Sequence, residues 1–340
     1  MKATNSTIQA NHIRRLMIDK FVSLGLNEDD ASVIALHLTE TSLDGTDTHG
    51  IRLFPTYVKE FEGGRSNPKP HIKVENESAV SALIDAGGAN GIIAAEYAIK
   101  IAIDKAKREG LSAIVVKNSN HFGAAINYSK QAAKEGLIAI SLTNSDALVS
   151  LAGGKEPLLG TNPIGFSAPA HEQAFHSDFA TSQVSYSKVK HWQKVGAEIP
   201  FGCARDESGE ESAQSQKVSS LQALGGYKGQ GLGFMVQILT AVLGGAPFDH
   251  ELSHLYSEPY DKPREVAHFF LVINPSLFGH SQDFKSRVDG LISEARAHSP
   301  LATLPGEIES QTKNIRLSEG IPIEPEFKAW LDELETPITP

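Results

Sequence analysis

Two histidines stand in polar loops where a group that handles protons could act on a ligand. His121 follows an apolar, β-branched run at 111–116 and precedes a helical pattern from Ala124, so it lies between a strand and a helix. Ligands bind at strand ends in open α/β proteins, and histidine exchanges a proton near neutral pH. A histidine here can also simply tie its loop to backbone carbonyls, so position alone leaves both roles open.

The other histidine, His49, lies in the polar link 44–50 between two expected helices, beside the hydroxyl of Thr48. A hydroxyl next to a histidine at a helix start can serve a substrate. The alternative is a Thr or Asp helix cap with a solvated histidine. Neither His49 nor His121 stands at ligand-like spacing from another His or Asp, so we expect no metal site.

The first part of the chain is predicted to be helical. Residues 9–25 carry apolar side chains at helical spacing, and Asn27 is placed to cap a second helix. A third helix is expected over about 50–61, with Pro55 near its first turn, where a missing N–H matters least. We therefore expect residues 1–64 to form a small helical unit.

From residue 72 onward, strands alternate with helices, and glycines mark many of the changes. The strands are expected at 72–76, 79–85, 111–117, 137–142, 174–182 and 268–273, and the helices at 92–108, 124–135, 232–243, 281–297 and 325–335. A further helix should carry Lys188 and Lys190, and the polar stretch 195–220 predicts an exposed excursion. The alternation indicates an α/β region over 65–300 with at least some parallel pairing, followed by a C-terminal segment, 301–340.

Two glycine-rich segments are candidates for ligand binding. One is the long polar loop at 153–166, and the other, at 225–231, leads into an apolar helix. Glycines before a helix leave backbone N–H groups open, which suits a phosphate, although close packing of a buried helix is the alternative. The usual dinucleotide pattern G-x-G-x-x-G after a strand is missing, as are the Walker A, H-E-x-x-H and G-x-S-x-G motifs.

The composition favours a globular protein and argues against a nucleic-acid-binding or membrane-spanning one. The 340 residues suit two or three domains, and 40% hydrophobic with 21% charged residues is typical of a globular protein. The net charge of −10 argues against nucleic acid as the main partner, and no apolar run approaches the roughly 20 residues that cross a bilayer. The N-terminus lacks the apolar core of a signal peptide, and the single Cys203 excludes a disulfide framework, so a reducing cytoplasm is the expected compartment.

Six short blocks are distinctive when they are taken together. They are Asp44-Gly45 with Thr48-His49-Gly50, Pro55 and Tyr57; Asn120-His121-Phe122-Gly123; Gly160-Thr161-Asn162-Pro163; Asp178-Phe179-Ala180-Thr181-Ser182; Gly226-Tyr227-Lys228-Gly229; and Leu304-Pro305-Gly306-Glu307. In this order the chain resembles the malate/L-lactate dehydrogenase family of the sulfolactate-dehydrogenase type. That family includes malate, lactate, sulfolactate and ureidoglycolate dehydrogenases, 2,3-diketogulonate reductase, and reductases of cyclic imines such as piperideine-2-carboxylate.

The resemblance implies a non-Rossmann α/β fold with an N-terminal helical unit and a mixed-sheet dinucleotide-binding domain. It also implies NAD or NADP as cofactor, a small-molecule substrate and a homodimer. The missing dinucleotide pattern agrees with a non-Rossmann fold. Neither the sequence nor the resemblance chooses between NAD and NADP.

The resemblance also implies roles for single residues. Thr48 and His49 would lie at the substrate, His121 would sit between nicotinamide and substrate, and Thr161 would touch the substrate. The residues implied at the cofactor are His121, Phe122, Gly123, Ala124, Ala125, Asp178, Phe179, Ala180, Gly225, Gly226, Leu304, Pro305, Gly306 and Glu307.

One block departs from the family pattern, which usually reads H-G-x-x-R with the arginine on the substrate carboxylate. Here Leu53 holds the usual arginine site and Arg52 stands one residue earlier, which turns a helical side chain by about 100°. Arg52 is the first candidate for the carboxylate partner, and Lys188 is the next. At the position of Lys188 many relatives have lysine, whereas the cyclic-imine reductases have aspartate.

The resemblance implies hydride transfer between nicotinamide and a carbonyl or imine carbon. A histidine would supply the accompanying proton, an effect of about 10²–10⁴ in rate, and the sequence does not choose between His121 and His49. The main hypothesis is an oxidoreductase of 2-oxo and 2-hydroxy acids. The alternatives are a reductase of a cyclic imine 2-carboxylate, against which Lys188 counts, and a non-catalytic nucleotide- or metabolite-binding relative, which Leu53 alone supports.

Overall fold

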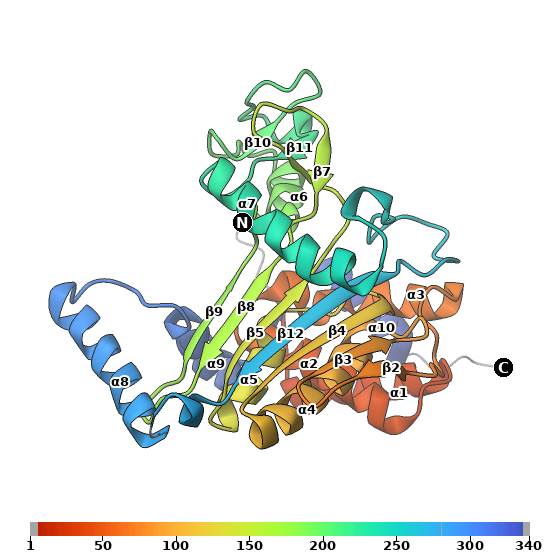
Figure 1. Ribbon diagram of the computed structural model, residues 1–340. Coiled ribbons are helices and arrows are strands. Elements are labelled where there is room, and N and C mark those ends of the chain that lie inside the picture. The colour runs from red at the N-terminus through yellow and green to blue at the C-terminus, as the bar shows by residue number, and fades with distance from the viewer. Residues whose placement is uncertain (1–5, 280, 336–340) are drawn as a thin grey trace. The chain divides into compact units, whose positions relative to one another are not determined.

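The computed structural model describes residues 6–279 and 281–335, and the chain divides into two compact units (Figure 1). The described residues of unit 1 are 6–59 and 303–335, and those of unit 2 are 60–279 and 281–302. Helix α3 (Phe54–Gly63) crosses the boundary between the units. Unit 1 therefore combines the two ends of the chain, and unit 2 is continuous in sequence.

Unit 1 is mainly helical, as expected for its N-terminal part. Its elements are β1 (Ser6–Ile8), α1 (Ala10–Ser23), α2 (Glu28–Leu43), the 3₁₀ turns η1 (Asp47–His49) and η2 (Ile51–Leu53), the first part of α3, α9 (Glu307–Glu319), β13 (Ile321–Ile323) and α10 (Pro325–Glu335). The predicted cap is confirmed, because the Asn27 side chain accepts the N–H of Asp30 at 2.8 Å. Phe54 is buried and meets Phe21 and Trp330 edge to face, with ring centroids 5.2 and 5.0 Å apart.

The C-terminal segment is more structured than the single closing helix that the sequence predicted. Strand β13 pairs antiparallel with β1, with Ile8 opposite Ile321, and both isoleucines are buried. Helix α9, which precedes β13, contacts α2. The two strands have three residues each, which is too short for a periodic pattern to reveal them, and their partners lie at opposite ends of the chain.

Unit 2 is built on a sheet of seven strands in the order β2-β3-β4-β12-β5-β8-β9. Its strands are β2 (Lys73–Glu77), β3 (Ser81–Asp85), β4 (Leu111–Ser119), β5 (Ile138–Thr143), β8 (Ile164–Ala168), β9 (Phe175–Phe179) and β12 (Val266–Ile273). Strands β3 and β4 are parallel, and the other neighbours are antiparallel. The expected α/β fold with a mixed sheet is confirmed.

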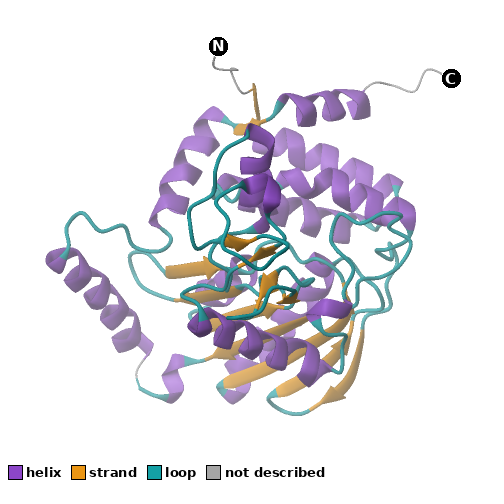
Figure 2. Cartoon of the chain, turned by 90° about the horizontal axis from the view of Figure 1, so that it is seen from above, coloured by secondary structure: helices purple, strands orange, loops and turns teal. Residues whose placement is uncertain are grey.

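Helices cover both faces of this sheet. One face carries α4 (Gly91–Glu109) and α5 (Ile126–Lys134), and the other carries α7 (Tyr227–Gln237) with the π-helical turn η4 (Ile238–Val242). The other helices of unit 2 are α6 (Tyr186–Val195), which packs on the second, smaller sheet, and α8 (Ser281–His298); the 3₁₀ turns are η3 (Ser215–Lys217), η5 (Asp249–Glu251) and η6 (Pro275–Leu277). Figure 2 shows the strands side by side in one layer.

Side-chain alternation along the central strands explains the two packed faces. Ile114 and Val116 of β4 join the core beneath α4 and α5, whereas Val115 between them packs with Val236 of α7 on the opposite face. Successive strand residues point to opposite faces, so a strand covered on both sides is apolar throughout. This is why the run at 111–116 reads as a continuous apolar segment.

The position of β12 decides which loops meet. This strand lies between β4 and β5 and is antiparallel to both. Val266 is opposite Ser119 at the end of β4, and His268 is opposite Thr143 at the end of β5. The N-terminal start of β12 therefore lies beside the C-terminal ends of both strands, where the polar loops begin.

The expectation of an exposed excursion at 195–220 is wrong in part. Short strands β10 (Ala204–Arg205) and β11 (Ser220–Leu221) form a second sheet with β6 (Val149–Ser150) and β7 (Pro157–Leu159), in the order β10-β11-β6-β7. Cys203, Ala204 and Leu221 are buried there. Pairing with residues about 70 positions earlier creates this sheet, and local composition carries no sign of it.

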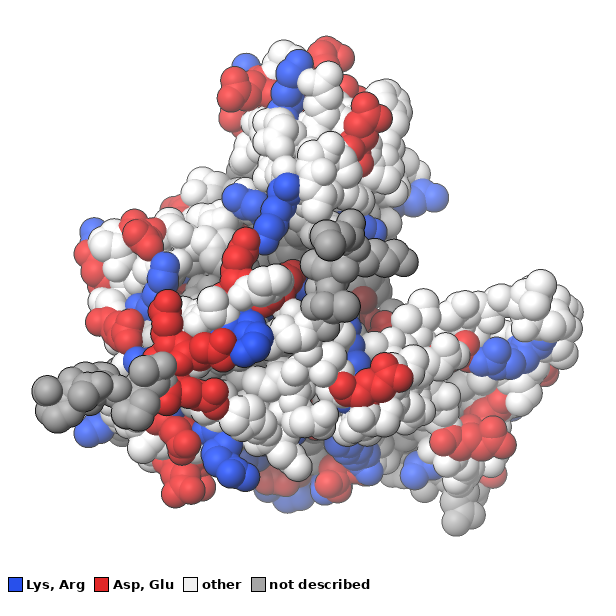
Figure 3. All heavy atoms as spheres, turned by 180° about the vertical axis from the view of Figure 1, so that it is seen from behind, with Lys and Arg blue, Asp and Glu red and all other residues white. Residues whose placement is uncertain are grey.

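The apolar helix expected at 232–243 begins earlier, at Tyr227, and is only half buried. Val236 and Ala241 face the interior, whereas Phe234, Met235, Ile238, Val242 and Leu243 are exposed. No helix among the described residues is long and apolar enough to cross a membrane. On the face of the molecule in Figure 3, basic side chains lie among acidic ones.

Candidate active site

His121 lies directly beyond the end of β4, in a loop whose neighbouring residues are fully buried. Its imidazole is half-buried, and its Nδ1 accepts the N–H of Gly123 at 3.4 Å. A ring nitrogen that accepts a hydrogen bond carries no proton, so this contact favours the tautomer with the proton on Nε2. His121 in this form can donate a hydrogen bond through Nε2, and as imidazolium it can donate the Nε2 proton.

Asn120 anchors the loop immediately before His121. Its Nδ2 donates to the carbonyls of Arg65, Gly88 and Ala89 at 3.0–3.2 Å, and its Oδ1 accepts the N–H of Arg264 at 3.1 Å. The side chain has no exposed surface. One buried amide therefore joins three segments of unit 2 at the residue preceding His121.

His268 of β12 supports the same loop from its other side. Its Nε2 lies 2.8 Å from the hydroxyl of Ser119 and its Nδ1 lies 2.8 Å from that of Thr143, while its ring stacks on Phe122 at 4.6 Å. The Phe122 carbonyl also accepts a hydrogen bond from the Tyr128 hydroxyl. Burial lowers the pKa of His268 to about 3, so the ring is neutral at pH 7 and its role is to hold β4 and β5 together.

A glycine at the start of α4 lets this helix approach the loop closely. A Cβ on Gly91 would come within 2.2 Å of the Asn120 carbonyl oxygen and 2.5 Å of the His121 carbonyl carbon. No larger residue fits without moving the backbone of the histidine loop. The loop is therefore fixed by packing as well as by hydrogen bonds.

The predicted cofactor residues of unit 2 fall into three places. Phe122, Ala124 and Ala125 are buried behind the His121 loop. Asp178, on β9 beside the exposed Phe179 and the half-buried Ala180, accepts the N–H of Ile126 at the start of α5 at 3.0 Å, which joins β9 to the segment after Ala125.

Gly225 and Gly226 form the turn into α7. Both have left-handed φ values, and an added Cβ would meet nothing within 4 Å at either position. Gly226, the residue before α7, provides no side-chain cap for the helix N-terminus. An open turn of this kind at an uncapped helix start fits the phosphate groups of a dinucleotide.

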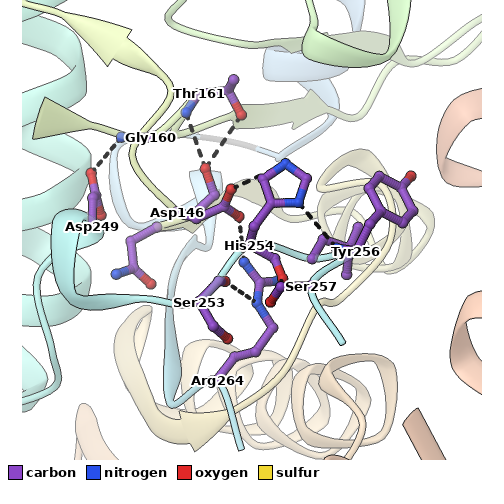
Figure 4. A network of polar contacts seen from close by, with 12 residues as sticks. Asp146, Gly160, Thr161, Asp249, Ser253, His254, Tyr256, Ser257 and Arg264 are labelled. Atoms are coloured by element: carbon purple, nitrogen blue, oxygen red, sulfur yellow. Dashed lines mark hydrogen bonds and ion pairs between the residues drawn. The ribbon is translucent and has the colours of Figure 1, made fainter. Parts of the chain in front are cut away.

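Thr161 lies in a polar cluster at the end of β5 (Figure 4). Its N–H donates to the Ser145 hydroxyl at 3.0 Å, and the two hydroxyl groups are 3.4 Å apart. Asp249 accepts hydrogen bonds from the N–H of Gly160 and from the side chain of Asn162, both at 2.8 Å. Burial raises the pKa of Asp249 to about 6, although these hydrogen bonds favour its charged form.

Three further ionisable groups occupy this cluster, and the sequence analysis did not identify any of them. Asp146 accepts a hydrogen bond from the buried guanidinium of Arg264, and its other oxygen lies 3.8 Å from Nε2 of His254. Asp146 follows a predicted strand, so the rule that singled out His121 could have found it. The segments that carry His254 and Arg264 show no pattern that predicts their place.

In unit 1, Thr48 and His49 interact directly, because the Thr48 hydroxyl lies 2.9 Å from Nδ1 of His49. Burial lowers the pKa of His49 to about 4, so its ring is neutral at pH 7. The following Gly50 allows close contact with α2, since a Cβ there would lie 2.0 Å from the Ser42 hydroxyl oxygen. That hydroxyl accepts the N–H of Ile51 at 2.9 Å, which fixes the backbone after the histidine.

Charged residues surround this segment of unit 1. Arg52 pairs with Glu324 at 3.0 Å and lies 3.9 Å from Asp47, while Leu53 is buried. Arg316 of α9 donates two hydrogen bonds to the Asp47 carboxylate, one of them at 3.0 Å. The α9 helix begins at the predicted Leu304-Pro305-Gly306-Glu307 block, where Glu307 accepts the N–H of Leu304 at 3.1 Å.

Lys188, the other predicted substrate residue, lies on α6 in unit 2. Its ammonium group is 5.3 Å from the centre of the Trp192 ring, and Lys190 has the same distance to Tyr186. Among the residues that the structure describes, no group of three His, Cys, Asp or Glu side chains is arranged to hold a metal ion.

The comparison with known proteins decides the family. The model of the malate/L-lactate dehydrogenase family matches residues 8–332. The chain belongs to this family. It is 36% identical to a malate dehydrogenase of Pyrococcus abyssi, over 96% of this chain and 92% of that protein.

Solved structures of family members have the same fold. The sulfolactate dehydrogenase of Methanocaldococcus jannaschii matches with a TM-score of 0.91 at 32% identity, over 97% of this chain and 96% of that one. The delta1-piperideine-2-carboxylate reductase of Pseudomonas syringae matches with a TM-score of 0.89 at 28% identity, over 97% and 99%. The protein is thus an oxidoreductase similar to malate and sulfolactate dehydrogenases, as the six sequence blocks predicted.

Proposed function

We propose that the protein transfers a hydride between NAD or NADP and a small 2-oxo or 2-hydroxy acid. The observation that carries the proposal is the fixed His121, whose Nδ1 accepts the Gly123 N–H and whose Nε2 is left as the proton-bearing atom. Membership of a family of malate and lactate dehydrogenases supports the same reaction class. A bound nicotinamide supplies or takes up the hydride.

The protein residues then handle the proton and the substrate. During reduction, negative charge develops on the carbonyl oxygen. His121 donates its Nε2 proton to that oxygen from the imidazolium form, in which Nδ1 also carries a proton and no longer accepts the Gly123 N–H, and is left as the neutral ring with Nε2 unprotonated. During oxidation, the same nitrogen accepts the proton of the hydroxyl group. Asn120 and His268 keep the loop of His121 in one position, which lowers the cost of orienting the donor.

We assign Thr48 and His49 to substrate binding. Neutral His49 accepts or donates one hydrogen bond, and contact between its Nδ1 and the Thr48 hydroxyl sets its orientation. His49 stays the second candidate for the proton donor. Arg52, Thr161 and Lys188 stay candidates for substrate contacts, although the pairing of Arg52 with Glu324 competes with a substrate carboxylate.

The cofactor proposal rests on the open glycine turn before α7 and on the segments around Ala125 and Asp178. Calorimetric titration with NADH and with NADPH tests it. Heat of binding from either nucleotide is expected, and the stronger ligand identifies the cofactor. No heat and no change in nucleotide fluorescence with both would refute the proposal.

Turnover separates the candidate functions. The protein is mixed with NADH or NADPH and, in turn, a panel of 2-oxo acids and a panel of cyclic imine 2-carboxylates, while absorbance at 340 nm is followed. We expect oxidation of the nucleotide with 2-oxo acids. Turnover of imines alone would establish the alternative reductase, and nucleotide binding without any turnover would indicate a non-catalytic relative.

We also propose a homodimer, supported by the exposed apolar face of α7 and η4. Phe234, Met235, Ile238 and Val242 recur at helical spacing on this face, and an exposed apolar surface of this kind marks an interaction site. Light scattering should give a dimer mass for the wild type and a monomer mass for Ile238→Lys with Val242→Lys. Lys130→Glu on the half-buried side of α5 is the control, and a monomeric wild type would contradict the proposal.

We propose the cytoplasm as the compartment. The one cysteine, Cys203, is buried and unpaired, which suits a protein that needs no oxidising environment. Fractionation of cells that produce the protein tests this, with enrichment in the soluble cytoplasmic fraction as the expected result. Recovery from a secreted fraction would refute it.

A further inference from the structure

His254 is a histidine with a fixed orientation beside the predicted substrate residue Thr161. Its side chain is 34% exposed, so a ligand can reach it. Its Nδ1 accepts the N–H of Tyr256 at 3.1 Å, which places the proton of the neutral ring on Nε2. Nε2 is directed toward Asp146, but the separation of 3.8 Å is longer than a hydrogen bond.

Two buried arginines hold the loop that carries this histidine. Arg65 donates to the carbonyls of Leu255 and Ser257 at 2.9 and 2.6 Å, and Arg264 donates through Nε to the carbonyl of Ser253 at 2.9 Å. The carbonyls of residues 253, 255 and 257 are therefore hydrogen-bonded to a buried arginine, and residues 254 and 256 lie between them in the chain. The imidazole of His254 is held in place, unlike a histidine on a mobile surface loop.

Asp146 connects His254 with Thr161. It is hydrogen-bonded to Arg264, and it directly follows Ser145, whose hydroxyl accepts the N–H of Thr161. Figure 4 shows Thr161, Asp146 and His254 in one group of polar side chains. The hydroxyls of Ser145 and Thr161 and the imidazole of His254 thus lie in one polar cluster within unit 2.

The first candidate for the carboxylate partner, Arg52, is already engaged by another side chain. Leu53 is apolar and buried, and the guanidinium of Arg52 is already paired with Glu324. A substrate carboxylate then needs a donor elsewhere. Arg264 is engaged by Asp146 and Ser253, so within the Thr161 cluster the accessible His254 is the ionisable side chain that can donate to a carboxylate.

We propose that His254, held by its arginine-bound loop near Asp146, binds the carboxylate of the substrate beside Thr161. The proposal rests on the oxidoreductase function proposed above and names the residue that selects an acidic substrate. As imidazolium, with Nδ1 protonated and the Tyr256 N–H contact given up, His254 binds the carboxylate through Nε2–H in a charge-assisted hydrogen bond. It is a substrate-binding residue, separate from the proton donor.

Several charged groups face His254 and set its protonation. Asp146 after β5 favours the imidazolium, whereas Arg264 before β12, Arg65 after α3 and Lys190 on α6 disfavour it. The rings of Tyr186 and Tyr256 lie 5.4 and 5.7 Å away. Burial is the largest effect and lowers the pKa of His254, so the imidazolium is lost as the pH rises through a value below the ordinary one.

Steady-state kinetics with the best 2-oxo acid of the panel test the proposal between pH 5.5 and 8.5. His254→Ala should raise KM by about 10- to 100-fold and leave kcat within about threefold, because a charged hydrogen bond to substrate is lost. His254→Gln should recover part of the affinity and remove the rise of KM with pH. His250→Ala, on the exposed turn η5 nearby, is the matched control.

Asp146→Asn should change the pH dependence of KM, which a purely structural role of Asp146 would not affect. Without the carboxylate, the pKa of His254 falls further, so KM should begin to rise at a lower pH than in the wild type. Melting temperatures show whether this variant folds, and if it does not, the loss of pH dependence in His254→Gln decides. Absence of turnover by the wild type would overturn the oxidoreductase function together with this proposal, whereas turnover with an unchanged KM in His254→Ala would overturn only the role of His254.

Discussion

The segments around His121 and His49 are supported in different ways. In unit 2, the residues next to His121 make neutral, fully buried hydrogen bonds through Asn120, Ser119 and His268. In unit 1, the residues next to His49 make ion pairs with the C-terminal segment, from Asp47 to Arg316 and from Arg52 to Glu324.

This difference indicates how each segment should respond to solution conditions. Buried neutral hydrogen bonds are insensitive to salt, and leaving one partner unsatisfied costs about 1–3 kcal/mol. Partly exposed ion pairs are weakened by salt and contribute less. The hydrogen bonds around His121, the proposed proton donor, should therefore keep their strength when salt is added. The ion pairs around Thr48 and His49, the proposed substrate pair, should weaken.

The largest expected effect is that of His121→Ala. Loss of the proton donor should lower kcat by about 10² or more, while the melting temperature changes little because the ring is only half-buried. Steady-state kinetics beside thermal unfolding measure both, with His298→Ala on the exposed end of α8 as the control. Wild-type kcat in His121→Ala would exclude this histidine as the donor.

Asn120→Ala tests the neutral support itself. The change leaves three carbonyls and the N–H of Arg264 without their partner, so we expect a loss of about 2–4 kcal/mol in the free energy of unfolding. kcat should fall as well, because the loop of His121 is no longer held. Urea unfolding measures the loss, and Asn76→Ala on the exposed strand β2 is the control; equal stability of both variants would contradict the role of Asn120.

His268→Gln tests the pH dependence of the same region. The pKa of His268 is about 3 in the folded protein and near 6.5 unfolded, so the unfolded state binds more protons between these values and stability falls as the pH falls below 6.5. Between pH 7 and 5 the wild type should lose about 2 kcal/mol through this residue, and His268→Gln should not. Unfolding at both pH values measures the difference, and His298→Gln should retain the wild-type loss.

Arg316→Ala tests the ionic support of unit 1. Its guanidinium binds the carboxylate of Asp47 with two hydrogen bonds in a partly buried place, so we expect a loss of about 1–2 kcal/mol. The loss should shrink when 0.5 M salt is added, which is the feature that distinguishes it from Asn120→Ala. Lys328→Ala, which breaks an exposed pair with Asp332, should cost less, and an Arg316 effect independent of salt would contradict the comparison.

The smallest effect is expected for Arg52→Ala. Arg52 and Glu324 are 37% and 39% exposed, so their ion pair should contribute less than about 1 kcal/mol. KM for 2-oxo acids should stay within about twofold, because the guanidinium is occupied by Glu324. An increase in KM of tenfold or more would restore Arg52 as the carboxylate partner and weaken the proposal for His254.

Local patterns predicted most elements, but they predicted the site only in part. His121 was found because a strand end followed by a polar loop is visible in the sequence, and the same rule applies to Asp146 after β5. Arg264 and His254 were missed because the loop that carries them has no periodic pattern. Leu53 was visible in the sequence, whereas the pairing of Arg52 with Glu324 joins residues about 270 positions apart.

The sequence by itself determined the helices other than α9, the alternation of strand and helix, the two histidines in polar loops and the resemblance to a family of dehydrogenases. These depend on residue spacing and on local backbone preferences. Only the tertiary structure decided that β12 lies between β4 and β5, because side-chain packing across the whole sheet selects strand order and register. That insertion brings Arg264 to Asn120 and Asp146, and it joins residues more than 100 positions apart into one polar cluster.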